Sequence, residues 1–214
     1  RFPVRWVLGD VANQRWAEVD PVMGSATLLD AMPQPEGWSN STLRPFATTH
    51  TVPSCGWMIQ QHAMAGKFDR QRADDLNLST KERAMLARGE DVTTADGTTL
   101  ESAWFRGGER APVSVLVSGD TAAMPPAWTD EVRPTLLIHE ATFLDEQQDK
   151  ADEHQHSTAT GAVATASAVG AESLALTHYS NRIKSTEEPV SEAKSAAGAL
   201  PVVALNDNDR MVVD

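Results

Sequence analysis

Three short apolar runs, each leading to side chains that bind metals or charged groups, constrain this 214-residue chain more than any other feature. The runs open the segments SVLVSGDT (114–121), TLLIHEATF (135–143) and SLALTHYSNR (173–182). Each run predicts a buried strand of about four to six residues. Active sites of layered α/β proteins gather at the carboxyl ends of such strands, because the sheet is rigid there and the loops vary freely. The repetition favours a functional site in this part of the chain.

The last third of the chain predicts an α/β fold. Strands are expected at 134–138, 173–177 and 201–205, with helices between them. The first helix opens at the segment HST and runs to about 169, where Gly170 ends it. Ser185 and Glu188 have the spacing of a capping box, so the second helix is expected to run to about Gly198. Alternating strands and helices indicate layers of this class.

The first two thirds carry weaker signals. Asp96-Gly97 between two short β-like segments predicts a tight hairpin, and Pro125-Pro126 predicts a loop. Residues 11–32 have a helical pattern in pieces, interrupted at Pro21 and Gly24. The other expected elements are a strand at 2–8, β-like runs at 42–50 and 55–61, a polar helix at 67–88 and a strand at 113–118.

Composition excludes several classes of protein. No apolar run reaches the ~18 residues of a membrane-spanning helix, so no membrane partner is expected. Cys55 is the only cysteine, which rules out an internal disulfide and fits the cytoplasm. The net charge of −12, from 18 basic and 30 acidic residues, argues against non-specific nucleic-acid binding. The chain begins with Arg1 directly before a strand-like run, and we expect that the N-terminal part of a longer protein is absent.

Three residues at predicted strand ends are candidate metal ligands: His50, Asp120 and His178. Imidazole and carboxylate groups bind zinc and similar hydrolytic metals, and an aspartate can bridge two ions. Taken singly, each is more often a hydrogen-bonded structural residue. Taken together, they favour a metal site.

Three further residues could complete the chemistry. His156 opens a helix, where the positive end of the helix dipole favours a phosphate or a tuned proton donor, although a surface histidine is an equal alternative. Glu140 could orient a ligand histidine or form an ordinary salt bridge. Arg182 could bind a phosphate through two hydrogen bonds, or be a solvated surface residue.

Six motifs occur in one order along the chain: HTVPSCGWMI, GKFDRQRADDLNL, SGDT, HEATF, HSTATGA and LTHYSNR. In this order they resemble ribonuclease Z, the tRNA 3′-processing endonuclease of the metallo-β-lactamase superfamily, over roughly residues 45–205. The resemblance implies an αββα sandwich in a single domain, 1–214, that is incomplete at its N-terminus. It also implies an inserted arm-like segment at 62–100, two zinc ions, cleavage of precursor tRNA after the discriminator base and a cytoplasmic protein that can form a homodimer.

The resemblance also implies a role for each site residue. His50 would ligate one zinc, Asp120 would bridge the pair and His178 would ligate the other. In catalysis, His156 would give a proton to the leaving 3′ oxygen and Glu140 would support the ligands. The substrate contacts would be Ser157, Ser180 and Arg182.

Two departures keep rival interpretations open. The family's HxHxDH motif is absent, so the chain offers each zinc fewer than the three or four protein ligands it usually takes. The arm-like stretch reads NLSTKERAMLARGEDV, without the family's Gly-Pro-rich segment. One rival is a hydrolase of the same fold that cleaves small phosphodiesters or sulfate esters. The other is a non-catalytic half that binds a partner chain or RNA.

Overall fold

The structure is a computed structural model that describes residues 4–108 and 110–213. The chain divides into two compact units. One comprises Arg1–Gln61 with Val113–Asp214, and the other comprises His62–Pro112. The α/β class predicted from the sequence is confirmed.

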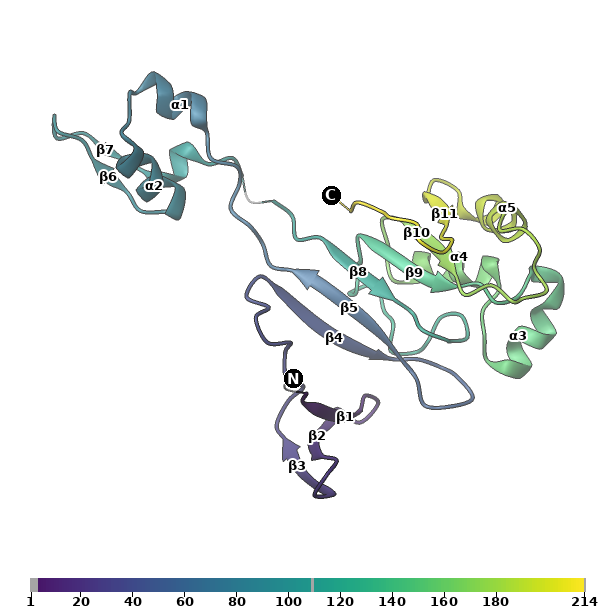
Figure 1. Cartoon of the computed structure of the whole chain (residues 1–214). Helices are drawn as coiled ribbons and strands as arrows, with labels where there is room; N and C mark the ends of the chain where they lie inside the picture. Colours follow the sequence, from purple (N-terminus) through teal and green to yellow (C-terminus); the bar gives the residue numbers. More distant parts are fainter. Residues whose placement is uncertain (1–3, 109, 214) are drawn as a thin grey trace. The chain divides into compact units, whose positions relative to one another are not determined.

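A six-stranded mixed sheet with the order β11-β10-β9-β8-β5-β4 forms the centre of the first unit (Figure 1). The last four strands along the chain, β8 to β11, run parallel to one another, whereas β5 pairs antiparallel with both β4 and β8. The bounds are β4 Ser41–Ala47, β5 Cys55–Gln61, β8 Ser114–Val117, β9 Leu136–Glu140, β10 Leu174–Thr177 and β11 Val202–Ala204. All six strands confirm the sequence prediction within a few residues.

Three helices and a short 3-10 turn belong to the same unit: η2 Asp145–Gln147, α3 Gln148–His154, α4 Ala159–Ala168 and α5 Glu187–Ala197. Ser157 and Thr158 of the HST segment are both possible N-caps, and Thr158 is the one that caps α4, because its side chain accepts a hydrogen bond from the N–H of Gly161. The capping box predicted for α5 is wrong. Its N-cap is Thr186, and Ser185 lies one residue too early, where its hydroxyl accepts from the N–H of Glu187.

The two faces of the sheet carry different rows of apolar side chains. One row runs across five strands through residues paired in register and is at most 5% exposed: Met58, Leu116, Leu137, Leu174 and Val202. This face forms the core with α4, which packs against β9 and β10, and with α5, which packs against β11. In the row on the opposite face Trp57, Val117 and Val203 are 37–41% exposed, whereas Ala175 on β10 is fully buried.

Strand β4 lies at one edge of the sheet, and its outward-facing backbone is already occupied. The side-chain amide of Gln34 both donates to and accepts from the backbone of Leu43. Pro45 has no N–H, and the carbonyl of Ala47 accepts from the indole N–H of Trp128. An edge blocked in this way cannot readily pair with a further strand.

A separate three-stranded antiparallel sheet precedes β4: β1 Trp6–Asp10, β2 Arg15–Asp20 and β3 Ser25–Leu29. The predicted helical pieces over residues 11–32 are therefore wrong. Pro21 and Gly24 do not interrupt a helix but lie in the turn between β2 and β3. The side chain of Asp20 accepts from two backbone N–H groups of that turn, and Gly24 adopts a φ of 64°. Residues 2 and 3 of the strand predicted at 2–8 lie outside the described residues.

The second unit has its own small core, formed by Ala73, Leu78, Leu86, Val92, Leu100 and Phe105. The helix predicted at 67–88 is two helices, α1 Arg70–Asp75 and α2 Thr80–Arg88, and Ser79 with Glu82 forms a capping box on α2. The hairpin predicted at Asp96-Gly97 is confirmed by β6 Val92–Thr93 and β7 Thr99–Leu100, followed by η1 Ser102–Phe105. Across both units, no helix among the described residues has the length and apolar character needed to cross a membrane.

Candidate metal centre

The loops after β4 and β8 bring His50 and Asp120 together. Thr49, beside His50, donates its N–H to the hydroxyl of Thr121, beside Asp120, at 3.1 Å. The carbonyl of Thr49 accepts from the N–H of Ala122 at 2.8 Å. One bond from backbone to side chain and one between backbone groups thus join residues of two loops that lie at least 72 positions apart. The positions of the two metal-capable side chains depend on these bonds rather than on the side chains alone.

Glu140, at the end of β9, is 1% exposed and organises the remaining loops. Its Oε1 accepts from the N–H of Thr121 at 2.7 Å and contacts Nδ1 of His156 at 2.7 Å. Its Oε2 accepts from the hydroxyl of Thr142 at 2.6 Å and from the N–H of Ser157 at 3.1 Å. A buried carboxylate is tolerated when its lone pairs are satisfied in this way. One side chain therefore ties the Asp120 loop to the loop that carries His156.

Thr142 extends this network to His178. Its hydroxyl lies 2.9 Å from Nδ1 of His178. A hydroxyl has one proton, and the carboxylate of Glu140 is its strongest acceptor, so Thr142 accepts from the Nδ1–H of His178. His178 itself has a left-handed φ of 55°, which favours glycine, and it lies 3.5 Å from Asp120 through its Nε2. The network fixes the ring of His178 at a backbone position that is unfavourable on its own.

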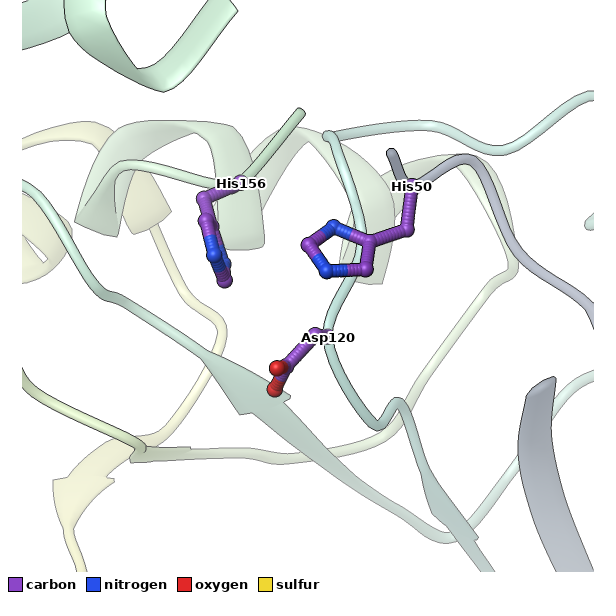
Figure 2. A group of neighbouring side chains, drawn as sticks. All are labelled: His50, Asp120 and His156. Atoms are coloured by element: carbon purple, nitrogen blue, oxygen red, sulfur yellow. The ribbon is translucent and has the colours of Figure 1, made fainter. Parts of the chain in front are cut away.

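The side chains of His50, Asp120 and His156 converge on one point (Figure 2). One ligand atom from each lies within 4.8 Å of the other two. Glu140, His156 and His178 form a second such group that shares His156. Two imidazoles and a carboxylate are a donor set that fits a divalent transition metal. In each of the three histidines Nδ1 is held by the protein, which leaves Nε2 for a ligand.

The residues predicted from the sequence are placed unequally around this centre. His50, Asp120, His156 and His178 gather as described, with Glu140 behind them. Ser180 is half-buried and accepts from the N–H of Arg182, whose side chain is exposed. Ser157 is 1% exposed and its hydroxyl donates to the carbonyl of Thr158, so it does not face solvent.

Two contributors were missed by sequence reasoning. Thr142 was visible only as a polar residue two positions after Glu140, and Gln155 acts through its backbone carbonyl, which accepts from Nδ1 of His50 at 3.0 Å. No side-chain pattern could have indicated the second. His139 is fully buried with Nδ1 on the carbonyl of Glu140 at 2.8 Å, and burial lowers the pKa of its imidazole. His139 is therefore part of the hydrophobic interior and not of the candidate metal centre.

Comparisons with known proteins identify relatives by sequence. No family model matches the chain. A ribonuclease Z from Synechococcus sp. (strain CC9605) is 39% identical over 142 residues, which are 66% of this chain and 44% of that protein. A ribonuclease Z from Halobacterium salinarum (strain ATCC 29341) is 33% identical over 154 residues, which are 72% of this chain and 50% of that protein. The chain spans about half the length of the curated relatives it matches, and the resemblance to ribonuclease Z is confirmed over that part.

Two solved structures resemble the chain more distantly. The short form of human tRNase Z aligns with 97% of this chain and 50% of its own length, at 19% identity and a TM-score of 0.48. The metallo-β-lactamase fold protein YhfI from Bacillus subtilis aligns with 82% of this chain and 52% of its own length, at 18% identity and a TM-score of 0.49.

Proposed function

We propose that this relative of ribonuclease Z is the metal-binding layer of a phosphodiesterase that processes the 3′ ends of precursor tRNA. The observation that carries the proposal is the network of Glu140, which joins the loops of Asp120, His156 and His178 through one buried carboxylate. Hydrogen-bonded support of this kind holds ligands in place and raises their affinity for a metal. The sequence matches to ribonuclease Z support an RNA phosphodiester as the substrate.

In the proposed site, His50, Asp120 and His178 would hold divalent metal, which the family resemblance implies is zinc in a two-ion form. When bound, such ions polarise a phosphate and activate the attacking water. The position of His156 allows two roles. It is a proton donor to the leaving 3′ oxygen, or, through its Nε2, a ligand beside His50 and Asp120. We assign His156 the role of proton donor, in which Glu140 holds Nδ1 of its ring so that Nε2 faces the centre.

The proposed contacts to RNA lie in the loop after β10. Arg182 is exposed and would bind a phosphate oxygen pair through its planar guanidinium, with Ser180 beside it. Ser157 would contribute through its N–H to Glu140 rather than by touching RNA. The segment 62–100 is proposed as an arm for tRNA, and its exposed basic residues support this: Lys67, Arg70, Arg72, Lys81 and Arg88.

The open face of the sheet supports a further part of the proposal, that a second β-layer would complete the site and strengthen its binding of metal. Trp57 and Val117 on β5 and β8, and Val203 on β11, are exposed apolar side chains on this face, next to strands that lead into the metal centre. A second apolar sheet would cover these side chains and could add the metal ligands that the chain lacks. The same observation favours the rival in which the chain is a non-catalytic half that binds a partner.

The test compares zinc content and cleavage in the purified chain and two variants. We expect zinc, measured by elemental mass spectrometry after dialysis, to remain with the wild type and to fall in Asp120→Asn. His156→Ala should retain zinc and cleave precursor tRNA about 10²–10⁴-fold more slowly, the usual cost of losing a proton donor. A loss of zinc in His156→Ala would make His156 a ligand instead.

Three outcomes separate the rivals. Equal zinc content in wild type and Asp120→Asn would overturn the metal site. Cleavage of a small chromogenic phosphodiester without cleavage of precursor tRNA would favour a hydrolase of small phosphodiesters or sulfate esters. Binding of RNA without cleavage, with zinc retained, would favour the non-catalytic interpretation. Sedimentation of the same samples tests the homodimer that the resemblance implies.

A further inference from the structure

Helix α3 ends in an unfavourable backbone conformation next to the metal centre. Its C-cap, Gln155, has φ 53° and ψ 46°, the left-handed region. A residue other than glycine pays about 1–2 kcal/mol for this conformation. The N–H of Gln155 donates to the carbonyls of Ala151 and Asp152 in the last turn of α3. These bonds and the left-handed backbone fix the direction of the carbonyl group of Gln155. Strained positions of this kind persist where the surrounding structure holds them.

The carbonyl that this conformation presents is bonded to His50. The distance from Nδ1 of His50 to the oxygen of Gln155 is 3.0 Å, across 105 positions of sequence. A carbonyl oxygen has no proton to give, so the hydrogen atom of this bond must be on Nδ1 of His50. In the neutral ring, Nε2 then keeps its lone pair, and only a lone pair can bind a metal ion.

We propose that the backbone carbonyl of Gln155 is the positioning group that selects the Nδ1–H tautomer of His50 and aims Nε2 at the metal centre. This inference rests on the proposed metal-binding function. It separates His50 from His156 and His178, whose Nδ1 atoms are held by side chains of the Glu140 network. Because the group at 155 is a carbonyl, its action depends on the left-handed backbone and not on the glutamine side chain.

The experiment reads the tautomer directly in the full 214-residue chain. Long-range ¹H–¹⁵N correlation spectra of metal-free, ¹⁵N-histidine-labelled protein are recorded at about pH 8, above the ordinary histidine pKa of ~6.5. The spectrum of His50→Asn assigns the His50 signals by their absence. Gln155→Gly keeps the left-handed backbone, whereas Gln155→Val opposes it, because a β-branched residue is an outlier there.

We expect the Nδ1–H tautomer for His50 in the wild type and in Gln155→Gly. In Gln155→Val, Nε2–H should appear, and the affinity for Zn²⁺, measured by competition with a chelator, should fall about 10–100-fold. The matched control is Asn208→Val, because Asn208 is also left-handed, with φ 71°, but lies in a turn near the C-terminus. It should leave the His50 tautomer and the zinc affinity unchanged.

Several results would overturn the inference. The Nε2–H tautomer in the wild type would do so without any variant, even if Gln155→Val failed to fold. So would an unchanged tautomer in folded Gln155→Val, or an equal loss of zinc affinity in Asn208→Val. The proposed metal-binding function is tested by a different result, the binding of zinc. If the chain bound no zinc but the tautomer responded as described, the positioning role would stand and the metal site would not.

Discussion

The two faces of the six-stranded sheet have the same kind of residues but different surroundings. On the helix-covered face Met58, Leu116 and Leu137 are at most 1% exposed, whereas on the other face Trp57 and Val117 are 37% and 39% exposed. The strands read as nearly continuous apolar runs, which is typical of sheets covered on both sides. Leu136 and Ala175 on that face are at most 2% exposed, so the second face is covered at β9 and β10 and exposed at β5, β8 and β11. The sequence therefore encodes two covered faces, while the described residues cover only one of them from β5 to β11.

The largest expected effect is on the helix-covered face. Leu137→Ala removes a fully buried side chain and should lower the free energy of unfolding by about 2–5 kcal/mol, through lost burial and the cavity left behind. The control is Val117→Ala on the open face, which should cost under about 1 kcal/mol. Urea-induced unfolding followed by circular dichroism measures both. Equal losses would abolish the distinction between the faces.

A smaller effect is expected from crowding the same covered face. A Cβ atom at Gly56 would lie 2.7 Å from the Trp128 ring and 2.9 Å from the backbone oxygen of Val117. Gly56→Ala should therefore lower the free energy of unfolding by about 1–3 kcal/mol, since the backbone must move. Gly107→Ala is the matched control, because no described atom outside its neighbours in the chain lies within 4 Å of its Cβ position. The two unfolding midpoints in urea decide the comparison.

The open face should tolerate a polar residue. Ile59 is 40% exposed, and Ile59→Thr should change the free energy of unfolding of this chain by less than about 1 kcal/mol. Thermal unfolding by calorimetry provides the measurement. A loss comparable to that of Leu137→Ala would mean that this face is buried in solution, for example against a second copy. Repeating the scan at a lower protein concentration would then lower Tm.

The smallest effect concerns the outer side of the helix layer. Burial, followed by the nearby carboxylates of Asp145, Glu146 and Glu188, raises the pKa of Glu192 on α5. The folded state thus binds a proton more readily than the unfolded state, and wild-type stability falls as pH rises through the folded pKa. Glu192→Gln should raise the free energy of unfolding at neutral pH. The increase should be only a few tenths of a kcal/mol, since the group is largely solvated. The gain should vanish below the ordinary glutamate pKa of 4.5. A constant difference across pH would exclude this cause.

The gathering of the candidate residues was largely predictable, because several of them follow predicted strands. Asp120 and His178 follow apolar strands that run parallel, so the carboxyl ends of these strands lie on the same side of the sheet. Glu140 ends the strand between them. His50 follows β4, which is antiparallel to its neighbour, and its place at the centre depends on bonds to distant segments, among them those of Thr49 to Thr121 and of His50 to Gln155. Such contacts between distant segments leave no local pattern.

The errors have physical causes of the same kind. In residues 11–32, Pro21 and Gly24 suit a turn as well as a broken helix, and only the pairing of β2 with β1 and β3 decides between them. The hairpin at Asp96-Gly97 was predictable because its turn chemistry is local. The carbonyl of Gln155 could not be predicted, since any residue carries one and its direction follows from a backbone angle.

The occupied edge at β4 has a consequence for how many molecules can join. A fibril built by strand addition needs two free edges on every copy, one to receive a neighbour and one to offer to the next. Gln34, Pro45 and Trp128 remove one of these edges. Strand addition through β11 would therefore stop at a pair, and continuous growth along the six-stranded sheet is not expected.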